Sequence, residues 1–153
     1  MNKISKIVAI TLACMIMMCM AVPAFATTGF EEGPTGWLQG NGTSTIGNNI
    51  VATATGNSLY VGGRASFKTT GSVAKRTITV TVGLYDVDTD YCLGYASKSQ
   101  SVSCTGAMAP TGYYSFKGTS TISYYAGQEC RYKVTRSNFN NAIYGRYKGY
   151  LSD

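Results

Sequence analysis

Residues 76–84 read Arg-Thr-Ile-Thr-Val-Thr-Val-Gly-Leu, and apolar residues alternate with small polar ones along this stretch. Ile78, Val80, Val82 and Leu84 share one parity, which is the two-residue period of a strand buried on one face. A helix would scatter these side chains around its axis. Burial of each contributes about 1.5–3 kcal/mol. The stretch therefore predicts a central strand with one face in the core.

The rest of the chain supplies further short extended runs, separated by residues typical of turns. Leu59, Val61, Ala65 and Phe67 share one parity, so the run that contains them presents a single apolar face. No segment after the amino terminus shows a sustained 3.6-residue period. Strands are expected at 49–56, 58–69, 73–86, 91–102, 111–124, 128–137 and 142–151. The sequence predicts an all-β, antiparallel β-sandwich of about seven strands in one domain, residues 48–153.

The amino terminus has the pattern of an export signal. Lys3 and Lys6 precede an apolar run over 7–22, and Ala24-Phe25-Ala26 has the small-x-small form of a signal-peptidase site. A membrane anchor is the alternative, but the run is shorter than the roughly 20 residues of a spanning helix. We expect a bacterial signal peptide over residues 1–26, cleavage after Ala26, and a secreted, extracellular protein without a transmembrane segment.

The segment 27–47 is rich in Gly, Thr and Asn, so we expect a flexible leader before the domain. Its Trp37 is the one Trp of the chain and is expected to dock on the domain. Removal of Lys3 and Lys6 leaves 11 of 13 basic residues against seven acidic ones, a mature charge of 11 − 7 = +4. This charge is compatible with polyanionic partners, although solubility alone would also explain it.

The chain contains no His. This excludes Ser-His-Asp and Cys-His catalysis and every metal site built on imidazole. We therefore expect a protein that is not an enzyme and that requires no cofactor.

Three aspartates alternate at Asp86, Asp88 and Asp90, and such carboxylates can converge on a hard cation. An EF-hand loop starting at Asp86 would need Gly at its sixth position and Glu at its twelfth, where the chain has Tyr91 and Ser97. A looser calcium site is left as a weak candidate. The simpler interpretation is a polar turn that exposes its carboxylates to water.

The last two predicted strands contain the best candidate for a binding surface. Their apolar residues fall on one parity and their basic and aromatic residues on the other. Neighbouring strands usually pair, which would join the outward residues into one face. This face would contain Arg131, Lys133, Tyr144, Arg146, Lys148 and Tyr150. Such a face can stack on sugars and contact anionic groups, but outward Lys and Arg are also what keeps a sheet soluble.

The sequence thus favours a secreted, non-catalytic protein that binds an anionic polymer or glycan at the cell surface. A specific nucleic-acid partner is not expected. The alternative is a secreted antibacterial or toxin-like protein, which small size, export and basic charge also favour.

The mature chain has three cysteines, Cys92, Cys104 and Cys130, so at least one has no partner within the chain. Strand polarity places Cys92 and Cys130 at the same end, and we expect these two to form a disulfide if strand 91–102 crosses to the opposite sheet. If that strand stays beside 73–86, one strand intervenes and the separation of about 9–10 Å is too long. A hairpin centred on Lys98 would pair Cys92 with Cys104, and the absence of any disulfide also stays open.

Three stretches carry a family resemblance: Thr-Ile-Thr-Val-Thr-Val-Gly-Leu-Tyr (77–85), the Ser-rich run 97–103, and Cys-Arg-Tyr-Lys-Val (130–134). Together they resemble a group of uncharacterised small secreted β-sandwich proteins of Gram-positive bacteria. The resemblance covers about residues 49–151 and implies an immunoglobulin-like sandwich. It supplies no catalytic or binding residue.

Overall fold

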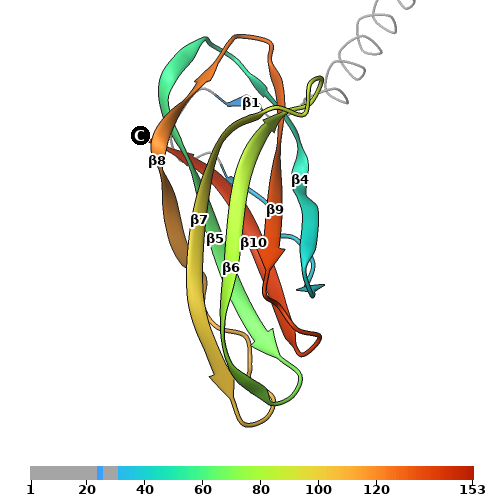
Figure 1. Cartoon of the computed structure of the whole chain (residues 1–153). Helices are drawn as coiled ribbons and strands as arrows, with labels where there is room; N and C mark the ends of the chain where they lie inside the picture. The colour runs from blue at the N-terminus through green and yellow to red at the C-terminus, as the bar shows by residue number, and fades with distance from the viewer. Residues whose placement is uncertain (1–23, 26–30) are drawn as a thin grey trace, which may run out of the picture.

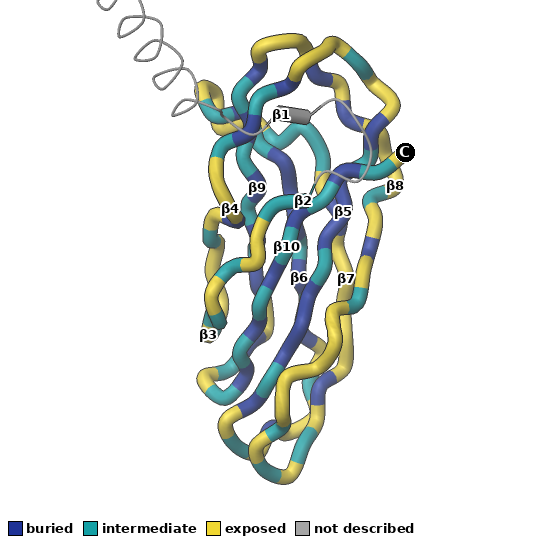
Figure 2. The backbone as a smooth tube through the Cα atoms, turned by 180° about the vertical axis from the view of Figure 1, so that it is seen from behind, coloured by how far each residue is buried: buried dark blue, intermediate teal, exposed yellow. Residues whose placement is uncertain are grey.

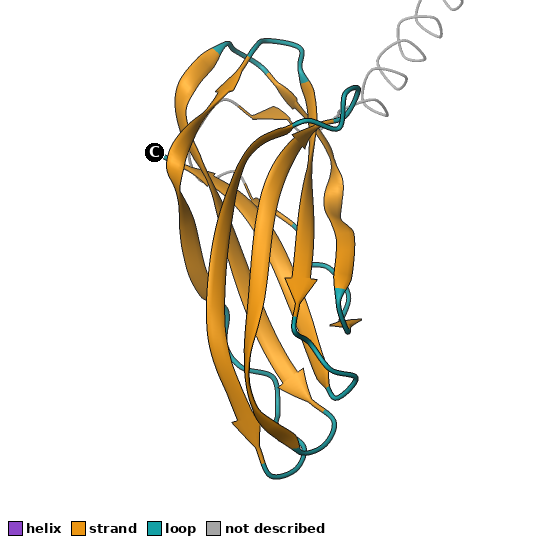
Figure 3. Cartoon of the chain, in the orientation of Figure 1, coloured by secondary structure: helices purple, strands orange, loops and turns teal. Residues whose placement is uncertain are grey.

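The computed structural model describes residues 24–25 and 31–153 (Figure 1). Every regular element of these residues is a strand (Figure 3), and they contain no helix long and apolar enough to cross a membrane. The strands are β1 (Ala24–Phe25), β2 (Glu31–Glu32), β3 (Leu38–Gln39), β4 (Gly42–Ala52), β5 (Gly56–Thr69), β6 (Val73–Asp86), β7 (Cys92–Cys104), β8 (Tyr114–Tyr124), β9 (Glu129–Ser137) and β10 (Ile143–Ser152).

The strands form two sheets that pack face to face. One has the order β1-β4-β9-β6-β7 and the other β2-β10-β5-β8, with β3 also paired to β10. All pairs are antiparallel except β1 with β4. The predicted all-β sandwich is confirmed. Its seven long strands are the seven expected ones, with β4 beginning at Gly42 instead of 49 and short strands added beside them.

The central pairings are those of an immunoglobulin-like sandwich. In that fold the second strand pairs with the fifth and the third with the sixth, and here β5 pairs with β8 and β6 with β9. The first, fourth and last long strands differ from the constant-type order, because β4 lies beside β9, β7 beside β6 and β10 beside β5. Each of these three strands lies in the sheet opposite to the one that this immunoglobulin order would give it.

Strand β6 occupies the centre that its sequence predicts. It is paired on one edge with β9 and on the other with β7. Ile78, Val80, Val82 and Leu84 are at most 1% exposed and lie in the core between the sheets. Figure 2 shows the same alternation of buried and less buried positions along β10, in the facing sheet.

The predicted flexible leader, 27–47, is wrong for the part that the structure describes. Residues 31–47 are attached to the sandwich through β2, β3 and the start of β4, and Ile46 is fully buried. The glycines misled the prediction because they supply backbone bends and an irregularity within β4 instead of flexibility. Gly33 and Gly47, for example, have φ of 110° and 64°, a region that residues with a Cβ rarely adopt. The domain therefore begins well before residue 48.

The predicted disulfide between Cys92 and Cys130 is also wrong, because all three described cysteines are free. Strand β7 stays beside β6, so Cys92 lies opposite Tyr85 while Cys130 lies opposite Asp86 from the other side. The intervening strand puts the two Cα atoms about 9–10 Å apart, beyond the roughly 4.4–6.8 Å of a disulfide. Cys104 lies at the opposite end of β7, which is one continuous strand and not a hairpin.

The predicted signal peptide, 1–26, lies outside the described residues except for β1. The backbone of β1 runs parallel to β4, with Ala24 opposite Val51 and Phe25 opposite Ala52. Cleavage after Ala26 stays a prediction, and it would remove β1 from the mature protein.

Candidate functional site

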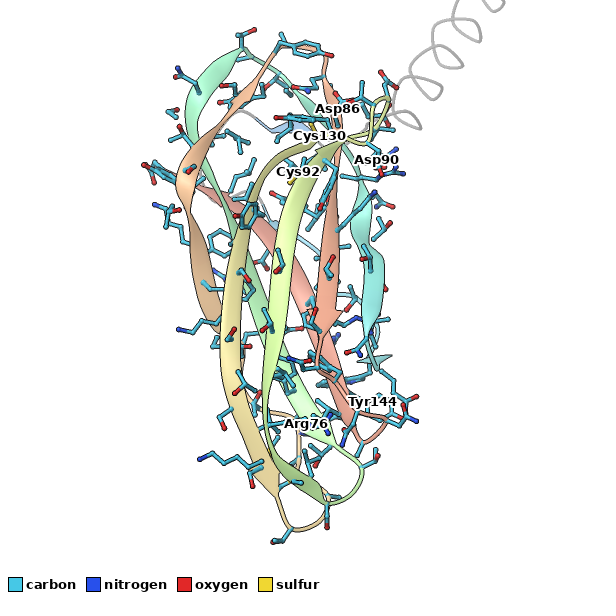
Figure 4. All side chains as sticks on the ribbon, in the orientation of Figure 1. Arg76, Asp86, Asp90, Cys92, Cys130 and Tyr144 are labelled. Carbon is cyan, nitrogen blue, oxygen red and sulfur yellow. The ribbon has the colours of Figure 1, made fainter. Side chains whose placement is uncertain are left out.

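The predicted binding surface is divided between the two sheets. Strand β9 belongs to the sheet of β6, whereas β10 belongs to the sheet of β5. The turn between them crosses the sandwich, so the assumption that neighbouring strands pair fails here. The predicted parity is nevertheless correct, since Ile143, Tyr147 and Leu151 are fully buried and the residues of the other parity, such as Tyr144 and Lys148, are only partly buried. Figure 4 shows Tyr144 of β10 far from Asp90, which lies at the opposite end of the molecule.

On the β9 side, the basic residues are already occupied by an acid. Lys133 Nζ lies 2.5 Å and Arg131 Nη2 3.1 Å from Asp90 Oδ1. Hydrogen bonds from Lys133 and then Arg131 hold the pKa of the Asp90 carboxyl below its usual range. Lys133 Nζ also lies 4.7 Å from the centre of the Tyr85 ring. Asp90 therefore balances one of the two positive charges of this cluster.

The three aspartates of the 86–90 turn do not converge. Asp86 is buried and accepts hydrogen bonds of 2.8 Å from Gln128 Nε2 and from the backbone N and hydroxyl of Thr89. The bond from Gln128, followed by those from Thr89, lowers the pKa of Asp86. Asp90 points toward β9, as described above, and Asp88 is exposed. Within residues 24–25 and 31–153, no group of three acidic, Cys or His residues could hold a metal ion.

The outer face of β10, β5 and β8 brings together basic residues from three strands. Lys148 lies opposite Arg64, Tyr144 opposite Lys68, and Lys117 opposite Gly62. The two-residue period explains this gathering, because the apolar parity of β5 and β10 faces the core and the other parity faces out. We call this surface the cationic–aromatic face: Arg64, Lys68, Lys117, Arg146 and Lys148 with Trp37, Tyr60, Tyr113, Tyr144 and Tyr150.

Four of the five cations of this face lie over aromatic rings. Lys68 Nζ is 4.7 Å from the ring centre of Trp37 and 5.6 Å from that of Tyr144. The other three contacts are Lys117 over Tyr60 at 4.1 Å, Lys148 over Tyr113 at 5.3 Å and Arg64 over Tyr150 at 5.4 Å. Such contacts are worth about 0.5–1 kcal/mol at exposed sites. They hold the charges in place without neutralising them.

One carboxylate side chain forms ion pairs on this face in the described part of the chain. Glu31 Oε2 lies 2.6 Å from Arg64 Nη1, and Glu31 Oε1 lies 2.5 Å from Lys148 Nζ. The pairing of β2 with β10 positions Glu31 opposite Tyr150. Lys117 reaches the main-chain oxygen of Asp153 at 2.5 Å. Lys68 and Arg146 form no ion pair with a residue that the structure describes, and Arg146 Nε donates to the main-chain oxygen of Thr35 at 3.3 Å.

The structure therefore brings the four predicted residues of β10 together on one face and places the two of β9 in the other sheet. Arg64, Lys68 and Lys117 were missed, although the apolar parity of 58–69 already implies that Arg64 and Lys68 point outward. Trp37 docks, as expected, but as part of this face. No sequence signal indicates that Trp37 and Lys68 meet, because their contact depends on how the amino-terminal segment wraps around β10.

Comparison with known proteins adds little. No family model and no curated protein matches the chain. Two solved structures of infectious bursal disease virus, of the Gx and Gt strains, are similar at 14% identity with TM-scores of 0.39 and 0.37. The matches cover 83% and 84% of this chain, which spans 30% and 31% of the viral chains. At TM-scores below 0.5 these likenesses carry no argument about fold or function.

Proposed function

We propose that this chain is a secreted, non-catalytic protein that binds an anionic polymer or glycan at the cell surface through the cationic–aromatic face. One observation carries the proposal: five basic side chains on one sheet face are interleaved with aromatic rings, and a single carboxylate side chain of the described residues, that of Glu31, pairs with two of them. Aromatic rings stack on sugars, and Lys and Arg contact carboxylate or phosphate groups.

The opposite sheet supports the same choice by contrast. Its two predicted basic residues, Arg131 and Lys133, share the carboxylate of Asp90 within 3.1 Å. A ligand that binds there must compete with an acid already in place. On the cationic–aromatic face, the described partners of the Lys68 ammonium are the rings of Trp37 and Tyr144. An anion that binds Lys68 therefore does not have to displace a carboxylate of the described residues.

The test is sedimentation of the purified mature protein with purified cell walls, followed by release with salt. We expect retention at low salt and release as salt rises, because exposed charges are screened. Lys68→Gln with Lys117→Gln should reduce retention and make it less sensitive to salt. The matched control is Arg131→Gln with Lys133→Gln, which removes the same charge from the other sheet.

The proposal requires the two double variants to differ. Equal loss of retention in both would show that net charge alone causes binding. Retention of the Lys68 and Lys117 variant at the wild-type level would exclude the cationic–aromatic face. Unchanged melting temperatures of both double variants would show that any loss of retention is a binding effect.

A further inference from the structure

Glu31 marks a position on the cationic–aromatic face where a carboxylate is bound. Its two oxygens divide between two cations, with Oε2 at 2.6 Å from Arg64 Nη1 and Oε1 at 2.5 Å from Lys148 Nζ. The Glu31 side chain is 25% exposed, so water reaches this position. An external carboxylate can therefore approach the same two cations.

The surroundings of this position fit a sugar. The Arg64 guanidinium lies over Tyr150, and Lys148 Nζ lies 5.3 Å from the ring centre of Tyr113, so an aromatic ring stands behind each cation. Tyr113 is 40% exposed and offers its ring to a ligand. The apolar faces of a pyranose can pack on such rings, whereas a phosphate chain has no apolar face to offer. Two cations, each over an aromatic ring, thus suit an acidic sugar better than a polyphosphate.

The segment that contains Glu31 is held on the domain by contacts that do not depend on the Glu31 carboxylate. Thr35 N donates to Tyr147 O at 2.9 Å, and Thr35 Oγ1 accepts from Tyr147 N at 3.1 Å. Leu38 packs against the core from the same segment. These attachments do not involve the Glu31 carboxylate. Its side chain can turn away while the segment stays on β10.

We infer that the face takes a carboxylate-bearing polysaccharide, one of whose carboxylates replaces that of Glu31 between Arg64 and Lys148. This inference rests on the proposed function and specifies its ligand. Glu31 then acts as a built-in competitor, and its removal strengthens binding. Replacement of the carboxylate by an amide leaves Arg64 and Lys148 free for the ligand, whether or not β2 stays paired.

The experiment is calorimetric titration of the full mature protein with polygalacturonate, for wild type, Glu31→Gln and Asp88→Asn. Asp88 is exposed in the turn after β6, and its substitution makes the same change in net charge. We expect Glu31→Gln to bind about two- to fivefold more tightly than wild type, the range of a partly exposed ion pair. Asp88→Asn should gain less. Glu31→Asp keeps the charge with a shorter reach and should fall between wild type and Glu31→Gln.

Polyphosphate of matched charge is the second probe, and the gain from Glu31→Gln should be larger for polygalacturonate. Equal gains in affinity for Glu31→Gln and Asp88→Asn would overturn the inference, and so would equal gains for the two polymers. In either case the proposed function would still hold if the wild-type protein binds. Absence of binding to both polymers in wild type and Glu31→Gln would overturn both. If Glu31→Gln has a lowered melting temperature, the Glu31→Asp variant is used instead. Its gain in affinity is then compared with that of Asp88→Asn and between the two polymers.

Discussion

Gly149 of β10 lies beneath the ring of Tyr132 of β9, across the core between the sheets. A Cβ on Gly149 would lie 2.5 Å from Cγ, 2.6 Å from Cδ1 and 2.9 Å from Cδ2 of Tyr132, where ordinary contact begins near 3.4 Å. Tyr132 is fully buried, so its ring has no free space into which to move. Gly149→Ala should therefore destabilise the fold by about 1–3 kcal/mol, the usual cost of overpacking.

Thermal and urea unfolding of the mature domain measure this cost. For a chain of this size each kcal/mol lowers the melting temperature by roughly 3–5 °C. Tyr132→Leu removes the ring and is destabilising by itself because it leaves a cavity. The double variant should be more stable than the sum of the two single effects by about 1–2 kcal/mol, since the added methyl occupies the space of the lost ring.

The matched control is Gly112→Ala, because a Cβ on Gly112 would have no neighbouring atom within 4 Å. Its effect should stay within about 0.5 kcal/mol. Equal effects of the two Gly→Ala changes, or strict additivity in the double variant, would refute the reasoning. Either result would mean that β9 and β10 do not face each other across the core.

Four further predictions follow from the described residues. Tyr147→Phe should be neutral or stabilise by up to about 1 kcal/mol in urea unfolding, because the buried hydroxyl has no hydrogen-bond partner within residues 24–25 and 31–153. A clear loss of stability would reveal a partner. All of Cys92, Cys104 and Cys130 should label without reductant after unfolding, with Cys130 protected in the native state. Burial, with smaller effects of Asp86 and Glu129, raises the pKa of the Cys130 thiol from 9.0 to about 12. The unfolded thiol thus loses its proton first, and stability should be complete below pH 9 and decrease between pH 9 and 12, as circular dichroism would measure. Limited proteolysis should leave residues 31–41 attached to the domain, because β2 and β3 pair with β10. Rapid cleavage within 31–41 would instead support the prediction of a flexible leader.

Sequence periodicity determines the inward side of each strand but not its neighbours. The bounds 73–86 and the buried side of β6 agree with the structure because alternation identifies both directly. The alternation of apolar and polar residues in β9 and β10 is equally compatible with one shared sheet or with two. The sequence therefore does not determine which strands pair with β9 and β10, and so which residues share a face with the predicted site. Glycine was ambiguous in the same way, since it is typical both of flexible segments and of turns with positive φ, such as that at Gly33.

The two outer faces of the sandwich differ in how their polar groups are satisfied, and this difference favours one of them for binding. On the sheet of β6, neighbouring hydroxyls bond to each other across the strands. These pairs are Thr79 with Ser99 and Thr81 with Ser97 at 2.9 Å, and Thr43 with Thr135 at 3.0 Å. A ligand there would have to break these bonds, just as it would have to displace Asp90 from Arg131 and Lys133. On the cationic–aromatic face four cations lie over rings, and only Arg64 and Lys148 pair with a carboxylate side chain of the described residues. Lys68, Lys117 and Arg146 keep their capacity for ion pairing, so that face has more to gain from an anionic partner.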